Sequence, residues 1–323
     1  MSAARHSPRL TVLSSRGDHH GAVVAEALRR QRGGDLDIRI VEMDAMAVQG
    51  GIRWEMDDGG ARLALKDGLG RWFDPAQSDV IWCRRFSRPQ QGGDGGDMAT
   101  IQWRQAGKII AALNGPVWRD HPDAIIAAES KPAQLAAAAV AGLHVPRTLV
   151  SQDAAAIRAF HAACDGRVIV KPVKGHIGRQ LFTVPLAAEA LADDAALAQF
   201  PAIYQQMIAG ADHLRLVVLP SAAQGFAIRS PELDWRRRRD LRIAACRTDA
   251  ALVARCRDVL ARLGLSMGVF DFKYDRQGRP WFLEVNPQGQ FFFLEALGRV
   301  DLASLYAADL GAHLPSAAIQ RSA

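Results

Sequence analysis

Residues 268–290 read GVFDFKYDRQGRPWFLEVNPQGQ, and this stretch decides the fold. Aromatic and β-branched residues fill 269–274 and 281–286, a composition typical of strands. Between them, residues 275–280 (DRQGRP) have the composition of a turn. The sequence therefore predicts a β-hairpin.

The side chains of this hairpin divide between two faces, because strand residues alternate with a period of two. If the turn is symmetric, Asp271 lies opposite Glu284, and Asn286 shares their face. The other face is predicted to enter a core and carries Phe270, Phe272, Leu283 and Val285.

Asp271 and Glu284 would repel each other across the two strands. Directly opposed side chains lie about 5 Å apart, and like charges at such a distance repel by about 1 kcal/mol in water and about 4 kcal/mol at an effective dielectric constant of 20. A cation between them would relieve this repulsion, and the oxygen ligands of Asp, Glu and Asn suit Mg²⁺ shared with a substrate's phosphates. The alternative is a solvated hairpin face that carries two acids.

Length and composition bound the class of protein. A chain of 323 residues predicts two or three domains. Hydrophobic residues make up 49% and charged residues 23%, as in ordinary globular proteins, which excludes general disorder. The cysteines show no CxxC or Cys/His spacing, which favours buried reduced thiols over a zinc site or disulfides; they are Cys83, Cys164, Cys246 and Cys256.

No targeting or membrane segment stands out in the sequence. The apolar run near the N-terminus is too short for a signal peptide, and no stretch approaches the roughly 18 apolar residues of a membrane span. We therefore expect a cytoplasmic protein without a membrane partner. The formal net charge of +6 favours an anionic partner, which could be a nucleotide, an acidic peptide or a nucleic acid.

The beginning of the chain predicts an α/β unit. Residues 9–15 and 37–42 are typical of strands, and 21–30 have helical spacing. The loop at 14–18 (SSRGD) lacks the GxGxxG pattern, which argues against a dinucleotide site. Further predicted elements are a hairpin at 54–73, strands at 80–85, 145–150, 202–208, 214–219 and 225–230, and helices at 100–113, 130–141, 251–263 and 302–311.

Three flexible or basic segments leave alternatives open. Residues 92–97 (GGDGGD) predict a mobile surface loop. The strand predicted at 168–173 runs into 174–179 (KGHIGR), whose glycines would let backbone N–H groups approach phosphate oxygens, although a plain basic turn would look the same. The four arginines at 236–239 are by default a solvated face, with nucleic-acid binding as the alternative.

The order and spacing of several motifs resemble the ATP-grasp superfamily. They are Lys131, Lys171, the segment Tyr204-Gln205-Gln206-Met207-Ile208, Asp212, Asp271 and the segment Phe282-Leu283-Glu284-Val285-Asn286. The resemblance implies an α/β (α+β) ATP-grasp fold with an N-terminal α/β pre-ATP-grasp domain. The domains would be residues 1–115, a central subdomain at 116–202, and a C-terminal subdomain at 203–323 that carries the metal hairpin.

The resemblance also implies roles for these residues toward ATP and Mg²⁺. Lys131 and Lys171 would reach the nucleotide and its phosphates, and Asp212 would accept hydrogen bonds from the ribose hydroxyls. The hinge against the adenine edge would be formed by Gln205, Gln206, Met207 and Ile208. Most ATP-grasp hinges carry Glu where this chain has Gln. Two Mg²⁺ ions would be held by Asp271, Glu284 and Asn286.

Flanking motifs narrow the resemblance to graspetide synthetases, the microviridin-type peptide maturases. These motifs are Ile81-Trp82-Cys83-Arg84-Arg85, Trp118-Arg119-Asp120-His121-Pro122, Asp234-Trp235-Arg236 and Asn286-Pro287-Gln288-Gly289-Gln290. Members of that family join side-chain carboxylates of a ribosomally made precursor peptide to Ser or Thr hydroxyls or Lys amines. The first 75 residues depart from typical members and show only a generic α/β start.

The chemistry of the residues fits such a reaction. Two lysines, a glycine loop and an acidic metal face suit γ-phosphoryl transfer to a carboxylate, which would give an acyl phosphate and then an ester or amide. Arg215 and Arg229 lie on predicted strands near the site, and guanidinium groups match carboxylate and phosphate geometry. Both are candidate catalytic residues, with surface ion pairing as the alternative.

Three functions remain open. The first is a ligase whose acidic precursor peptide contacts Asp234, Arg236 and Arg237, and a homodimer is a further candidate assembly. The second is an ATP-grasp ligase that acts on a free small acid. The third is a nucleic-acid-binding protein that uses the arginine run, but this run lacks interleaved aromatic residues apart from Trp235.

Overall fold

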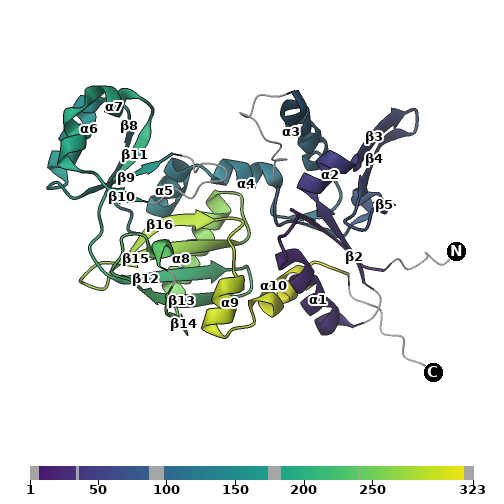
Figure 1. Ribbon diagram of the computed structural model, residues 1–323. Helices are drawn as coiled ribbons and strands as arrows, with labels where there is room; N and C mark the ends of the chain where they lie inside the picture. Colours follow the sequence, from purple (N-terminus) through teal and green to yellow (C-terminus); the bar gives the residue numbers. More distant parts are fainter. Residues whose placement is uncertain (1–6, 34–35, 87–97, 174–182, 239, 316–323) are drawn as a thin grey trace.

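The computed structural model describes residues 7–33, 36–86, 98–173, 183–238 and 240–315, which form four β-sheets and the helices that cover them (Figure 1). The basic glycine segment at 174–179 and the predicted surface loop at 92–97 lie outside these residues. Within the described part, no helix is long and apolar enough to cross a membrane.

The first sheet is parallel and has the strand order β2-β1-β6-β7. It begins with the β-α-β unit that the sequence predicts, formed by β1 (Arg9–Ser14), α1 (His20–Arg32) and β2 (Asp37–Glu42). The sheet continues on the other side of β1 with β6 (Val80–Cys83) and β7 (Val117–Arg119).

A three-stranded antiparallel sheet confirms the hairpin predicted at 54–73. Its strands are β3 (Ile52–Asp57), β4 (Gly60–Lys66) and β5 (Trp72–Phe73), in that order. It projects from the first sheet near α2 (Met43–Gln49) and α3 (Met98–Ala111), as Figure 1 shows. The short 3₁₀ helix η1 (Pro75–Gln77) leads from it into β6.

The second large unit is an antiparallel sheet with the order β10-β9-β11-β8. Its strands are β8 (Thr148–Ser151), β9 (Val168–Pro172), β10 (Val184–Pro185) and β11 (Ala202–Gln206). Its helices are α6 (Ala154–Ala163), η2 (Ala188–Ala192) and α7 (Asp194–Ala198). Ile157 of α6 and Leu197 of α7 pack with Tyr204 of β11 in one buried cluster. This unit therefore has a small hydrophobic core of its own.

The third sheet is antiparallel and has the order β14-β13-β12-β15-β16. Its strands are β12 (Asp212–Val218), β13 (Ala223–Arg229), β14 (Ile243–Cys246), β15 (Gly268–Tyr274) and β16 (Pro280–Asn286). One face is covered by α5 (Lys131–Val140) and α8 (Ala250–Arg262), and α4 (Pro122–Ala128) and the 3₁₀ helix η3 (Trp235–Arg237) lie nearby. As predicted, Ser130 caps α5, and Gly142 follows its end with φ +77°.

The β15–β16 hairpin has the predicted register, with Asp271 opposite Glu284. One expectation is wrong, because Leu283 does not point into the core. A β-bulge follows Asp271, so Phe272 pairs with Phe282 and the alternation along β16 shifts by one residue. Phe282 is therefore fully buried with Phe272, and Leu283 faces the opposite side of the sheet.

The C-terminal segment returns to the first sheet. Its helices are α9 (Phe292–Gly298), which the sequence analysis did not predict, and α10 (Leu302–Gly311), which has the predicted bounds. Helix α10 packs beside α1, as Figure 1 shows. The predicted division at 116 and 203 stays a prediction. Strand pairing favours boundaries after β7 and after β11, because each of these strands belongs to the sheet that precedes it.

Candidate active site

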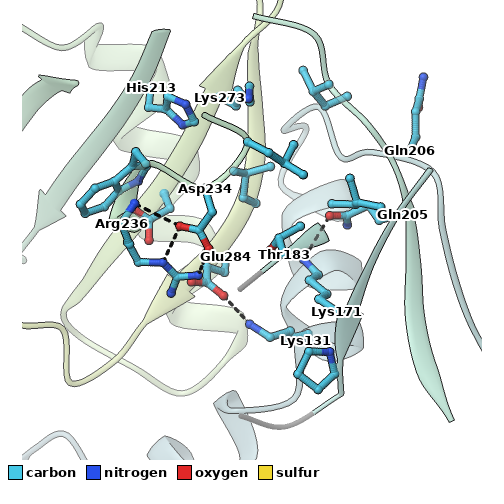
Figure 2. Close-up of a pocket in the computed structure, with 17 residues that line it drawn as sticks. Lys131, Lys171, Thr183, Gln205, Gln206, His213, Asp234, Arg236, Lys273 and Glu284 are labelled. Carbon is cyan, nitrogen blue, oxygen red and sulfur yellow. Dashed lines mark hydrogen bonds and ion pairs between the residues drawn. The ribbon is translucent and has the colours of Figure 1, made fainter. Parts of the chain in front are cut away.

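A cavity lies between the β8–β11 sheet and the β12–β16 sheet, and side chains from both sheets line it (Figure 2). Its charged lining residues are Lys131, Lys171, Asp234, Arg236, Asp271, Lys273 and Glu284. Ile169, Ile208 and Leu283 form an apolar part of the wall. Apolar surface together with several cations suits a ligand that carries both a ring and an anionic group.

Lys131 reaches this cavity from the first residue of α5. Two hydrogen bonds between the side chain of Gln134 and the backbone of Val285, at 2.9 and 3.0 Å, fix the helix against β16. The Lys131 ammonium group forms an ion pair with Glu284, as Figure 2 shows. The helix start is thereby held at a defined place on the hairpin.

The carboxyl group of Glu284 is strongly acidic. Burial alone would raise its pKa, but the positive charges of Lys131, Lys171 and Arg236 outweigh burial and lower the pKa to about 2. Glu284 is therefore a carboxylate at neutral pH, and three cations converge on it.

Lys171 lies on β9, across the cavity from Glu284. Its ammonium group donates to the side-chain carbonyl of Gln205 at 3.1 Å (Figure 2). Burial, followed by the positive charge of Lys131, lowers the pKa of Lys171 to about 8, although Glu284 opposes this shift. An anionic ligand between the two lysines would relieve their repulsion and raise this pKa.

Asp271 is held from two sides. One terminal nitrogen of Arg215 donates to both of its carboxylate oxygens, at 2.9 and 2.8 Å, and the amide of Asn286 donates to one of them at 3.2 Å. Burial raises the pKa of Asp271, and the charge of Arg215 opposes this shift. The register and this hydrogen bond confirm that Asn286 shares the face of Asp271 and Glu284.

These three residues fit a Mg²⁺ site. In the described residues, no group of three His, Cys, Asp or Glu side chains could hold a metal ion by itself. Mg²⁺, however, commonly takes one or two carboxylates and completes its shell with phosphate oxygens and water. Asp271 and Glu284, opposed on adjacent strands and beside the amide oxygen of Asn286, supply such a partial set of hard oxygen ligands.

A second cavity lies on the other side of the acidic pair. It shares Trp235, Arg236, Asp271 and Glu284 with the first cavity. Its own lining includes Arg85, Arg215, Asn286, Gln290 and Phe293. The guanidinium group of Arg215 lies 5.8 Å from the ring centre of Trp235 and 5.5 Å from that of Phe293, so aromatic rings fix its plane. The acidic pair thus stands where the two cavities meet.

Comparison with known proteins gives matches only at the level of structure. The sequence matches no protein-family model, and no curated protein matches it. Macrocyclase MdnC from Microcystis aeruginosa MRC, bound with precursor peptide MdnA, superposes with a TM-score of 0.80 and 22% sequence identity over 94% of this chain and 99% of that chain.

Two further solved structures carry nucleotide and peptide. A RiPP-associated ATP-grasp ligase from Chryseobacterium gregarium, in complex with ADP and a leader and core peptide, matches with a TM-score of 0.80 and 17% identity over 94% of this chain and 95% of that chain. ATP-grasp ligase PsnB, complexed with minimal precursor, Mg and ADP, matches with a TM-score of 0.75 and 24% identity over 97% and 99%. This chain has the ATP-grasp fold. The predicted fold class and the predicted resemblance are confirmed.

Within the ATP-grasp fold, the structure brings most of the predicted site residues together. The first cavity is lined by Lys131, Lys171, Gln205, Gln206, Ile208, Asp234, Arg236, Asp271 and Glu284, and the second adds Arg215 and Asn286. The side chain of Gln206 points away from the charged centre in Figure 2 and accepts a hydrogen bond from the backbone N–H of Arg147 at 3.4 Å.

Four predicted site residues are not among those that line either cavity: Met207, Asp212, Arg229 and Arg237. Asp212 and Arg229 are opposite each other on β12 and β13, are both exposed, and form an ion pair at 3.9 Å. Arg229 therefore takes the surface ion-pairing role that was the alternative to a catalytic one. Met207 uses its backbone N–H to bond the carbonyl of Arg167 at 2.9 Å.

His213 and Lys273 line the first cavity and were missed by the sequence analysis. They are opposite each other on β12 and β15, and only 3% and 5% of their surfaces are exposed. Burial and the charge of Lys273 lower the pKa of His213 to about 4, so its ring is neutral at neutral pH. Period-two alternation from Arg215 and Asp271 places these two residues, and not Asp212, on the site face.

Proposed function

We propose that this chain is an ATP- and Mg²⁺-dependent ligase that condenses a side-chain carboxylate of a ribosomally made precursor peptide with a Ser or Thr hydroxyl or a Lys amine. The observation that carries this proposal is the position of Asp271 and Glu284 at the junction of two cavities. The first cavity presents Lys131, Lys171 and Lys273, and the second presents Arg85, Arg215 and Arg236. The peptide-bound and nucleotide-bound neighbours with the same fold support it.

The first cavity suits ATP. Lys131 and Lys171 would neutralise phosphate charge, and the apolar wall around Ile169 and Ile208 would cover the base. Mg²⁺, held by Asp271 and Glu284 with Asn286, would neutralise the charge that develops on the transferred phosphoryl group.

The second cavity suits the carboxylate that is activated. Arg215 and Arg236 flank the acidic pair, and guanidinium groups orient carboxylates through paired N–H donors. A carboxylate oxygen held there would attack the γ-phosphorus, and the bond from that phosphorus to its bridging oxygen would break to release ADP. The resulting acyl phosphate would remain beside both arginines.

The second half of the reaction needs a nucleophile from the same peptide. A hydroxyl or amine would attack the acyl carbon, the bond to the phosphate oxygen would break, and inorganic phosphate would leave. The nucleophile's proton would pass to solvent, and the peptide would have lost one water for each ester or amide link.

The arginine run does not support nucleic-acid binding. Arg236 forms a paired interaction with Asp234 at 2.8 and 2.6 Å, and Arg238 pairs with Asp240. Trp235 lines both cavities beside Arg215, so the aromatic residue of this segment is part of the site. The η3 turn therefore places one arginine of the run, Arg236, beside Asp271 and Glu284.

The test is to incubate the purified chain with ATP, Mg²⁺ and short peptides rich in Asp, Glu, Ser, Thr and Lys, chosen from reading frames next to its gene. Mass spectrometry should show ADP and a peptide that has lost one water per link, and Glu284→Gln should give neither product. ADP formation with free amino acids, and no dehydrated peptide, would replace this proposal with a small-molecule ligase.

A further inference from the structure

Residues 286–290, at the end of β16 and directly after it, form one continuous wall of the second cavity. All five line this cavity, and Asn286 also belongs to the proposed Mg²⁺ site. Gly289 packs directly onto β15, because a Cβ atom at this position would lie 2.5 Å from a side-chain carbon of Val269. The shape of the second cavity therefore depends on where the backbone of this segment lies.

The first sheet and its helix α1 hold this segment at two points. Arg84, directly after β6, donates from Nη1 to the carbonyl of Gln288 at 2.7 Å. His20, the first residue of α1, accepts a hydrogen bond at Nε2 from the backbone N–H of Phe291 at 3.2 Å. These bonds join residues that are 204 and 271 positions apart in the sequence, and they lie at the two ends of the stretch 288–291.

The ring of His20 is fixed in one orientation and one protonation state. Burial lowers its pKa, although the hydrogen bond with Asp18 opposes this shift, and the ring is neutral at neutral pH. A neutral ring that accepts at Nε2 carries its proton at Nδ1, from which it donates to Asp18. Phe292 stacks on the ring, with centroids 3.9 Å apart and planes 6° apart. These contacts keep the acceptor Nε2 directed at Phe291.

Arg84 is buried although the burial of a cation is unfavourable. Only 3% of its surface is exposed, and burial together with the positive charge of Arg85 lowers its pKa to about 10. Its Nε is buried without a hydrogen-bond partner among the described residues, and Asp18 is its counter-charge at 3.4 Å. Apolar side chains of similar size often stabilise a fold as well as a buried ion pair does. The bond to Gln288 is what such a side chain could not supply.

The same segment also contacts the arginine that would orient the substrate. The carbonyl of Gln290 accepts from Nη2 of Arg215 at 3.5 Å, while Nη1 of that guanidinium group donates to Asp271. A shift of the segment would therefore move both the cavity wall and a group that fixes Arg215. Arg84 and His20 line neither cavity, so their effect on a substrate would pass through the segment.

We propose that Arg84 and His20 are positioning residues for the second cavity. They hold the backbone of 288–291 where the cavity wall and Arg215 fit the carboxylate of the peptide. This inference rests on the proposed ligase function, and it gives two residues outside the cavity a part in substrate binding.

The first test measures backbone amide exchange in the full chain and needs no turnover. Arg84→Met and His20→Leu each remove one bond to the segment and leave an apolar side chain in its place. Exchange at 288–292 should become about tenfold faster or more in each variant, while β12 and β15 keep the parent rates. Arg32→Met is the matched control, because its guanidinium group also joins α1 to a backbone carbonyl, that of Gly311, and lines neither cavity.

The second test measures steady-state kinetics with a peptide that the parent chain dehydrates. The KM for this peptide should rise about fivefold or more in Arg84→Met and in His20→Leu, because the cavity wall is no longer held. The KM for ATP should stay at the parent value, since residues 286–290 line the second cavity and not the first. Arg32→Met should change neither KM.

Urea unfolding separates positioning from a purely structural role. The unfolding midpoint of Arg84→Met should lie close to that of the parent, because Asp18 keeps its bonds with Arg85 and His20 and is not left unpaired. A purely structural role would instead lower the midpoint and raise the KM values for peptide and ATP together.

Unchanged exchange at 288–292 in both variants would overturn the proposal, and so would faster exchange with an unchanged KM for the peptide. Absence of peptide turnover by the parent chain would instead refute the proposed function. Faster exchange in the two variants would then still support the hold of Arg84 and His20 on the segment, so the two failures are distinguishable.

Discussion

Lys171 couples nucleotide binding to pH. Its pKa of about 8 reflects burial and the nearby charge of Lys131, so raising the pH from 7 to 9 removes its proton in the free protein. The phosphates of ADP are already ionised at pH 7, with a second pKa of about 6. Because the ammonium form binds phosphate, ADP affinity should fall by about tenfold between pH 7 and pH 9.

Calorimetry with ADP across this pH range checks the prediction. Lys171→Arg is the control, because a guanidinium group stays charged throughout, and its ADP affinity should be nearly independent of pH. Lys171→Met should bind ADP weakly at every pH. A parent affinity that stays flat up to pH 9 would remove Lys171 from the phosphate site.

The proposed role of Glu284 as a Mg²⁺ ligand can be tested with a single substitution. Glu284→Gln keeps the shape of the side chain but removes a charged Mg²⁺ ligand and leaves Lys131 without its ion pair. We expect ATP turnover to fall by at least about 100-fold, while Glu26→Gln on the exposed face of α1 should leave it unchanged. The measurement is ADP release at saturating Mg²⁺, and substantial turnover by Glu284→Gln would refute the assignment.

Some residues of the candidate site could be predicted from the sequence, and others could not. Lys131, Lys171, Asp271 and Glu284 could be found because each has a recognisable type at a recognisable spacing. His213 belongs to no such motif, and the one sequence signal for it was its position two residues before Arg215 on the same strand. Its burial decides its neutral state, and burial depends on segments far away in the sequence.

At the scale of elements, the β15–β16 hairpin was the most predictable part of the molecule. Its polar turn and its alternation fixed the pairing of Asp271 with Glu284. The bulge beside that pair could not be foreseen, because no local signal marks the residue at which the alternation shifts. It places Phe282 in one buried cluster with Phe270 and Phe272. Helix α9 was missed because its sequence, FFLEALG, is as short and aromatic as a strand.

The η3 turn yields a prediction for the peptide. Arg236 sits between the two cavities and pairs with Asp234, whereas its neighbour Arg237 lines neither cavity. Arg236→Ala should therefore raise the KM for an acidic peptide substrate by about tenfold, the cost of one charge-assisted hydrogen bond, and should make KM less sensitive to salt. Arg237→Ala is the matched control.

Steady-state kinetics at two salt concentrations measure this effect. Equal changes in the KM of the two variants would show that the arginines at 236–239 attract the peptide only through their overall positive charge. A change in kcat alone for Arg236→Ala would instead assign this arginine to the acyl phosphate and not to the peptide.

At the scale of the whole molecule, the first sheet and the C-terminal helix α10 are joined through a buried charge pair. Arg119, at the end of β7, donates to Asp309 of α10 at 2.8 Å, and only 7% and 2% of these residues are exposed. They are 190 residues apart in the sequence, and nothing in the sequence around either residue indicates that the two would pair. This closure carries Tyr306 and Leu310 of α10 into the core of the first sheet.

The pair makes a sharp prediction about stability. Asp309→Ala removes the carboxylate that is hydrogen-bonded to the buried Arg119 guanidinium, which should cost about 3–5 kcal/mol in the free energy of unfolding. Asp258→Ala breaks the exposed pair with Arg262, whose side chains are 44% and 43% exposed, and should cost less than about 1 kcal/mol. Urea unfolding of the full chain compares the two variants.

The double variant Arg119→Met/Asp309→Leu decides what the pair contributes. A buried ion pair offsets its own desolvation, so replacing both charges with apolar side chains of similar size should recover most of the stability that Asp309→Ala loses. Recovery would mean that the pair selects where α10 docks and adds little net free energy. If the double variant is as unstable as Asp309→Ala, the hydrogen bond itself holds α10 against the first sheet.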